Sequence, residues 1–247
     1  MFATTLPGAT HQVEHDGRTY GVRFPDSPYM RNAVAGIFAQ HDYPFIPCLA
    51  GESGAVLDIG ANVGATALLF RLQYPLCPVF AFEPAPSTFA YLAENVAALD
   101  RAQAINVGLF DRDAATRLYT SDVSITNSMG TSALNGDHYE DVRVWRASRA
   151  LDELEIDRIT LIKMDTEGAE VPILRDIEDR LDRVSALFIE YHSERDRREI
   201  DAMLVDQFML YCASASRPHL GTAGYVSRAL LAARTDAERL AITRPRL

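Results

Sequence analysis

The stretch VLDIGANVG, from Val56 to Gly64, decides the fold class of this chain. It begins with an apolar, mostly branched run, which is typical of a strand buried on both faces of a parallel sheet. Asp58 stands at the carboxyl end of that strand, and small residues follow it at a spacing of two. Residues 65–72 are rich in helix formers and contain no Gly or Pro. A strand, a small-residue turn and a helix predict the nucleotide-binding half of a doubly wound fold.

Two later motifs also place acidic residues at predicted strand ends. FAFEPAP, residues 80–86, puts Glu83 about 20 residues after the glycine turn, where folds of this class bind a ribose diol. An exposed Glu before a turn is the alternative interpretation. LIKMDTEGAE, residues 161–170, is a buried strand followed by Asp165 and further acids. Ligands in such sheets bind beyond the carboxyl ends of the strands, so we expect these acids around one site.

The motifs VLDIGANVG, FAFEP, LIKMDTEGAE and IEYH (Ile189 to His192) together resemble the FkbM family of S-adenosylmethionine (SAM) dependent methyltransferases. The resemblance covers roughly residues 43–206. It implies SAM as the cofactor and methyl transfer to a hydroxyl of a sugar, a glycan or a secondary metabolite. The residues expected to bind the cofactor are Asp58, Gly60, Ala61, Asn62, Gly64, Glu83, Pro84, Gly108, Leu109 and Asp165.

The composition is that of an ordinary globular protein. The 247 residues are 48% hydrophobic and 23% charged, and their net charge of −10 argues against binding to nucleic acid. No apolar run reaches the ~20 residues of a membrane span, and the start lacks a signal-peptide pattern. Three cysteines without a C-x-x-C spacing indicate reduced thiols. We therefore expect a cytoplasmic protein with a small-molecule or glycan acceptor, and a homodimer stays open.

The resemblance implies a class I, Rossmann-like fold with a doubly wound, mostly parallel seven-stranded sheet. An N-terminal accessory segment (1–42) is expected to precede the methyltransferase domain (43–247), which carries an insertion at 111–149. The accessory segment should hold a hairpin and an amphipathic helix that packs on the domain, with a lid as the alternative for the amino-terminal end of that helix. Within the insertion, the polar segment 121–138 is expected to be a substrate-side loop. The predicted strands are 56–59, 79–82, 104–109, 116–120, 142–145, 159–164, 184–191, 208–213 and 225–230, and the predicted helices are 29–41, 65–72, 87–98, 150–154, 171–181, 196–204 and 232–247.

The expected catalytic residues are His192, Asp165 and Glu190, at the ends of two neighbouring strands. An alcohol loses a proton when it is methylated, and His192, with an unperturbed pKa of about 6.5, is suited to take it. Asp165 or Glu190 would orient the imidazole, and a structural histidine at a strand end is the alternative. Lys163 is expected to form an ion pair with Asp165 or a neighbouring acid. No spacing among these residues is diagnostic of a metal, so we predict none.

Two other functions compete with methyl transfer. An NAD-dependent oxidoreductase of Rossmann type is disfavoured because the sequence lacks both G-x-G-x-x-G and a Tyr-x-x-x-Lys pair. A non-catalytic, methyltransferase-like SAM-binding protein is disfavoured because the set of Asp58, Gly60, Gly64, Glu83 and Asp165 is complete.

Overall fold

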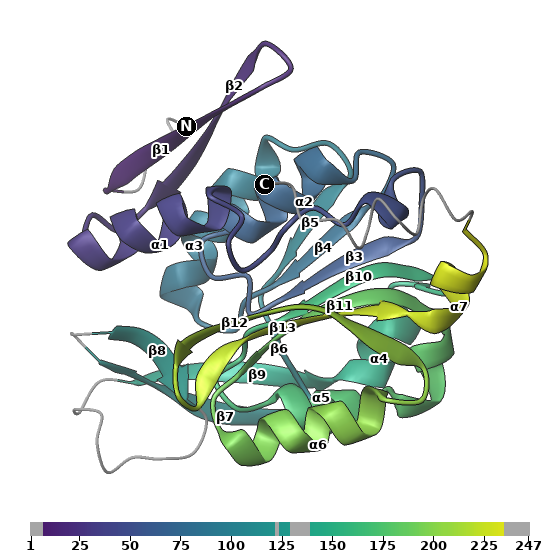
Figure 1. The fold of residues 1–247 in the computed structure, drawn as a ribbon. Helices are drawn as coiled ribbons and strands as arrows, with labels where there is room; N and C mark the ends of the chain where they lie inside the picture. Colours follow the sequence, from purple (N-terminus) through teal and green to yellow (C-terminus); the bar gives the residue numbers. More distant parts are fainter. Residues whose placement is uncertain (1–6, 122–123, 129–138, 235–247) are drawn as a thin grey trace.

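The computed structural model describes residues 7–121, 124–128 and 139–234. Its centre is a seven-stranded sheet in the order β12-β13-β11-β10-β3-β4-β5 (Figure 1). Neighbouring strands are parallel, except that β13 runs antiparallel to both β11 and β12. The predicted doubly wound, mostly parallel sheet is therefore confirmed. The strands are β3 (Ala55–Ile59), β4 (Val79–Phe82), β5 (Ala102–Ile105), β10 (Ile159–Met164), β11 (Val184–Tyr191), β12 (Phe208–Arg217) and β13 (Leu220–Ser227).

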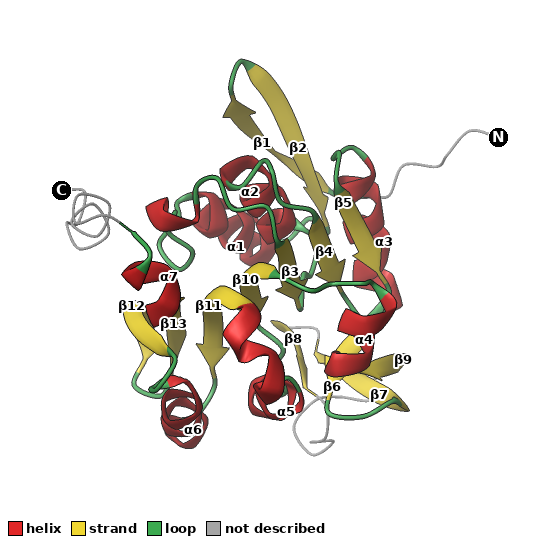
Figure 2. Ribbon diagram, turned by 90° about the vertical axis from the view of Figure 1, so that its right-hand side faces the viewer, coloured by secondary structure: helices red, strands yellow, loops and turns green. Residues whose placement is uncertain are grey.

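Helices cover both faces of this sheet (Figures 1 and 2). Side chains alternate along a strand, so Leu57 and Ile59 share a hydrophobic cluster with one helical layer and Val56 shares a cluster with the other. This burial on two sides explains why the central strands are almost wholly apolar. One layer contains α2 (Ala65–Gln73) and α3 (Pro86–Ala97), and the other contains α4 (Ala147–Glu153), α5 (Glu170–Asp176) and α6 (Glu194–Leu204).

The N-terminal hairpin, β1 (Ala9–His15) and β2 (Arg18–Phe24), projects from the body of the molecule in Figure 1. The helix α1 (Pro28–Phe38) follows it, and both pack against α2 and α3 through one hydrophobic cluster. The Asn95 amide ties these parts together, because it donates to the carbonyl oxygens of Arg23 and Val63 and accepts from the Arg23 N–H. The predicted hairpin and packed helix are thus confirmed.

A second, four-stranded sheet has the order β6-β9-β7-β8. The predicted single strand 104–109 is wrong, because Asn106 donates to the carbonyl oxygens of Glu83 and Pro84 and turns the chain out of the main sheet. The polar segment 121–138 contains a strand where a loop was predicted, and its residues 122–123 and 129–138 lie outside the described residues. The strands are β6 (Gly108–Phe110), β7 (Ala114–Ser121), β8 (Ser124–Ser128) and β9 (Tyr139–Arg146).

Several predicted boundaries in the C-terminal half are wrong: the strand predicted over 208–213 extends to Arg217, and the one predicted over 225–230 begins at Leu220. The helix predicted over 171–181 ends at Asp176, whose carboxylate accepts from the Ser148 N–H, and a 3₁₀ helix (Glu178–Arg183) follows. The strand predicted over 225–230 ends at Ser227, whose hydroxyl accepts from the Leu230 N–H and caps α7 (Arg228–Ala232). Most of the predicted terminal helix, residues 235–247, lies outside the described residues. Among the helices described, none has the length and apolar character needed to cross a membrane.

Candidate active site

A cavity of about 690 Å³ lies at the carboxyl ends of the central strands. The glycine turn after β3 forms part of its floor, with Gly60 and Asn62 both at positive φ. A Cβ atom on Gly60 would lie 1.9 Å from the Asp165 carbonyl oxygen, so only glycine permits this approach of the β3 and β10 ends. The Asn62 N–H donates to the Glu83 carboxylate at 3.1 Å, which links the turn to the end of β4.

Glu83 presents a buried carboxylate to this cavity. Its side-chain oxygens accept from the backbone N–H groups of Asn62 and Ala85, at 3.1 and 2.9 Å. Burial raises the pKa of Glu83 to about 7, although these two hydrogen bonds lower it. A carboxylate has about four lone-pair sites, so after two backbone contacts Glu83 keeps acceptor capacity for a pair of hydroxyl groups.

Asp58 lies behind the cavity wall and does not line it. Its fully buried carboxylate accepts from the Thr66 hydroxyl at 2.6 Å and lies 3.3 Å from Lys163 Nζ. Lys163 Nζ also donates to the Gly60 carbonyl oxygen at 2.5 Å and lies 3.7 Å from Asp165 Oδ2. Burial opposes the charge of Lys163, but Asp58 and Asp165 raise its pKa. The expected ion pair of Lys163 is confirmed. Asp58 contacts the glycine turn only indirectly, because it fixes Lys163, which binds the Gly60 carbonyl oxygen.

Some of the remaining predicted cofactor residues line the cavity and others lie behind it. Pro84, Gly108 and Leu109 line the cavity, whereas Ala61 and Gly64 do not. Gly64, at φ 87°, lies at the N-cap of α2 and packs against Leu92, so its conformation starts the helix. Three apolar side chains that the motifs did not indicate complete this end of the cavity: Leu118, Val142 and Val144. The two valines alternate with exposed residues along β9. This alternation in the sequence was the signal that could have indicated that their side chains face inward.

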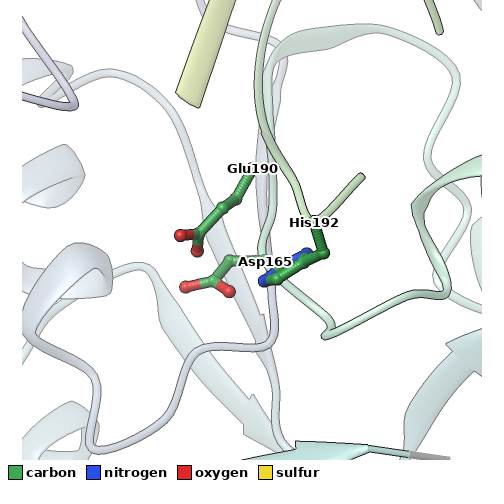
Figure 3. Close-up of side chains that lie close together, drawn as sticks. All are labelled: Asp165, Glu190 and His192. Atoms are coloured by element: carbon green, nitrogen blue, oxygen red, sulfur yellow. The ribbon is translucent and has the colours of Figure 1, made fainter. Parts of the chain in front are cut away.

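The predicted catalytic residues Asp165, Glu190 and His192 lie together, as Figure 3 shows. One ligand-type atom from each lies within 4.8 Å of the others. Burial, together with the charge and hydrogen bond of Asp165, raises the pKa of Glu190 well above its usual range. Glu190 therefore keeps its proton at neutral pH. The three groups have the chemistry of a divalent-cation site, but Asp165 is already near Lys163, and His192 is already paired with Glu167.

The partners of His192 differ from those predicted. Its Nε2 lies 3.1 Å from Glu167 Oε2 and its Nδ1 lies 3.8 Å from Glu170 Oε1, so Glu167 and Glu170 orient the ring. The reason is the turn before α5, where the Glu170 carboxylate accepts from the N–H groups of Thr166 and Gly168 and holds this acidic turn against His192. Burial lowers the pKa of His192, but the Glu167 hydrogen bond and the Glu170 charge raise it well above 6.5. His192 is thus an imidazolium at neutral pH.

Further cavity-lining residues come from regions that carried no motif. Tyr29, in the first turn of α1, is 50% exposed, and burial of its hydroxyl together with Asp165, Glu167 and Glu190 raises its pKa. The amino-terminal end of α1 therefore lies beside these acids. On another side, the end of β12 contributes Arg217.

The sequence matches the family described as Methyltransferase FkbM domain over residues 58–215, which is more than half of the chain. The chain belongs to the FkbM methyltransferase family. Methyltransferase 1 of Beauveria bassiana is 31% identical over 151 residues, which cover 52% of this chain and 60% of that protein. Hexuronic acid methyltransferase AglP of Haloferax volcanii is 25% identical over 156 residues, covering 63% of each protein. 2-O-methyltransferase NoeI of Sinorhizobium fredii is 28% identical over 154 residues, covering 56% of this chain and 63% of that protein.

The matched part of this FkbM-family chain spans 60–63% of the length of these relatives. The family match includes Glu83, Asp165, Glu190 and His192 and ends before Arg217. The family assignment thus rests on a part of the chain that contains these strand-end residues and not on Arg217.

Proposed function

We propose that this FkbM domain is a SAM-dependent O-methyltransferase that acts on a hydroxyl group of a sugar, a glycan or a secondary metabolite. The observation that carries the proposal is one cavity with two chemically different ends. A buried carboxylate, Glu83, is suited to a diol, and the close group of Asp165, Glu190 and His192 at the neighbouring strand ends has side chains that can give or take a proton. The relatives named for hexuronic acid methylation and 2-O-methylation support a hydroxyl acceptor.

The residues at the Glu83 end fit the nucleoside of SAM. Glu83 would accept hydrogen bonds from the ribose diol, and the apolar side chains of Leu109 and Val144 would contact the adenine. SAM supplies a methyl group on a positively charged sulfonium. Asp165 and Glu167 line the other end of the same cavity, and their carboxylates favour a cationic ligand there. Residues 1–42 are proposed as an accessory segment that contributes Tyr29 to this cavity.

At the acceptor end, Asp165 and Glu190 bind the hydroxyl group and His192 takes its proton. These residues mainly align the hydroxyl group with the methyl group. Such alignment can lower the barrier of a bimolecular reaction by ~7–11 kcal/mol. His192 accepts a proton only in its deprotonated form, and its raised pKa keeps that form scarce at neutral pH. Turnover should therefore rise with pH through the alkaline range.

Calorimetric titration of the purified protein with SAM and with NADH tests the cofactor. SAM should bind and NADH should not. Glu83→Ala should weaken SAM binding tenfold or more, because hydrogen bonds to a charged group are worth about 1.5–3 kcal/mol. Glu178→Ala, an exposed site on the 3₁₀ helix, is the matched control. NADH binding, or unchanged SAM affinity in a folded Glu83→Ala protein, would overturn the cofactor assignment.

Transfer of a labelled methyl group to sugar, glycan and polyketide acceptors then tests the reaction. A labelled ether on a hydroxyl group is the expected product. SAM binding without transfer to any hydroxyl acceptor, or transfer to nitrogen, would contradict O-methylation and leave the cofactor assignment in place.

A further inference from the structure

Arg217 is held at the cavity by a tight hairpin. It is the last residue of β12 and pairs with Leu220, the first residue of β13, while the Ser216 hydroxyl donates to the Leu220 carbonyl oxygen at 3.3 Å. A Cβ atom on Gly221 would lie 2.1 Å from the Ser214 carbonyl oxygen and 2.7 Å from the Tyr191 hydroxyl. The hairpin is therefore packed closely against β11, and the backbone of Arg217 has a fixed place.

The strand register puts this hairpin next to the acceptor-side residues. Tyr191 of β11 pairs with Gly221 of β13, so the following residue, His192, lies level with Leu220, and Arg217 lies one strand further. Neighbouring strands are about 4.8 Å apart, so the backbones of His192 and Arg217 are separated by roughly 10 Å. Both residues line the same cavity. A ligand of the size of one or two sugar rings can contact both.

Arg217 has no counter-ion among the residues that the structure describes. Within the described residues, its guanidinium forms no ion pair or hydrogen bond, whereas Arg149, for example, contacts both Asp113 and Glu153. Among the described lining residues, Arg217 is the one arginine, and the other charged groups are carboxylates and His192. Arg217 is exposed, so its guanidinium can reach a ligand in the cavity, and its planar fork is suited to bidentate binding of a carboxylate or a phosphate.

We propose that Arg217 selects an acceptor that carries an anionic group, a carboxylate or a phosphate, within about 10 Å of the hydroxyl that faces His192. This inference rests on the proposed function, because it concerns the acceptor of the methyl transfer. Measuring the binding of acceptor probes tests it separately from the reaction. The acids at the hydroxyl end would repel such an anion, so the cation at the end of β12 fixes the orientation of the acceptor. The family match ends at residue 215, before this contact.

Ligand-observed NMR with SAM present measures binding of methyl glucuronide, a glucose phosphate and uncharged methyl glucoside. At least one anionic probe should bind about tenfold or more tightly than methyl glucoside. Arg217→Gln should abolish that preference, and Arg217→Lys should restore part of it, since the charge returns without the bidentate fork. Arg158→Gln, at an exposed site before β10, should change nothing.

SAM affinity and acceptor binding together decide between the outcomes. A preference for the glucuronide assigns a carboxylate acceptor, and a preference for the phosphate assigns a phosphorylated one. Equal binding of charged and neutral probes, or a preference that survives Arg217→Gln, overturns the proposal. So does a loss of SAM affinity in Arg217→Gln, because Arg217 would then bind the SAM carboxylate. If the anionic preference depends on Arg217 but no probe is methylated, the inference stands and the proposed reaction fails.

Discussion

Replacing Glu167 by Gln should lower the pKa of His192. Glu167 Oε2 lies 3.1 Å from His192 Nε2, and the two side chains are 27% and 21% exposed, so solvent screens the pair only in part. A hydrogen bond to a charged group contributes about 1.5–3 kcal/mol, and one pKa unit corresponds to about 1.36 kcal/mol. The pKa of His192 should therefore fall by about one to two units in Glu167→Gln.

Imidazole NMR titration measures this change without any acceptor. The chain has six histidines, and a His192→Ala spectrum assigns the resonance. Glu178→Gln, an exposed position on the 3₁₀ helix, should leave the titration unchanged. A wild-type pKa of 6.5 or lower, or an equal pKa in wild type and Glu167→Gln, would refute the reasoning.

The same substitution should change the pH dependence of stability. The raised pKa of His192 means that the folded state holds its proton more tightly than the unfolded state does. The resulting stabilisation is fully present below the unfolded pKa of about 6.5 and is lost as pH rises through the folded pKa. The difference in unfolding free energy between wild type and Glu167→Gln should therefore be largest in mild acid and shrink in alkali.

Three further predictions concern the same group of residues. Lys163→Met should lower the unfolding free energy measured in urea titrations by about 3–5 kcal/mol, because Asp58 is left buried without its counter-charge. Adding Asp58→Asn should recover part of this loss. If the double variant recovers no stability, the pairing of Lys163 with Asp58 is contradicted. His192→Ala should reduce labelled methyl transfer by about 10²–10⁴ with SAM affinity unchanged, whereas near-normal turnover with an unaltered pH profile would assign the proton to Asp165 or water. EDTA treatment should leave turnover unchanged, because Lys163 and Glu167 already engage Asp165 and His192, and a loss restored by Mg²⁺ would show a metal requirement.

The main sheet was predictable because a buried parallel strand is an uninterrupted apolar run. Strand β10 was predicted with its observed bounds, Ile159–Met164, and the acid that follows it lies at the carboxyl edge by topology alone. In contrast, the second sheet depends on long-range contacts. Nothing local in the sequence shows that Asn106 bonds to the backbone after β4 and moves the chain from one sheet to the other.

The partners of His192 were not predictable for a related reason. Sequence reasoning gave the correct neighbourhood, since Asp165 and Glu190 do lie beside the ring. Which acid contacts the imidazole depends on the turn before α5, where Glu167 adopts a φ of 57°. A positive φ at a non-glycine residue is uncommon and leaves no signal in the sequence. The structure therefore changes the protonation state expected for His192 as well as its partners.

Of the 24 lysine and arginine residues in the sequence, Lys163 is the one lysine, and it is 2% exposed in the middle of the main sheet. A protease that cleaves after lysine therefore has a single target bond in this sequence. That bond lies within β10, which pairs with β11 on one side and with β3 on the other. Cleavage requires the sheet to open at its centre, so the rate of nicking under native conditions measures the free energy of that opening when reclosing is fast. A bound ligand that holds the Gly60 turn against the Lys163 ammonium should slow this cleavage. The cleavage rate therefore measures how much of the protein has its site occupied.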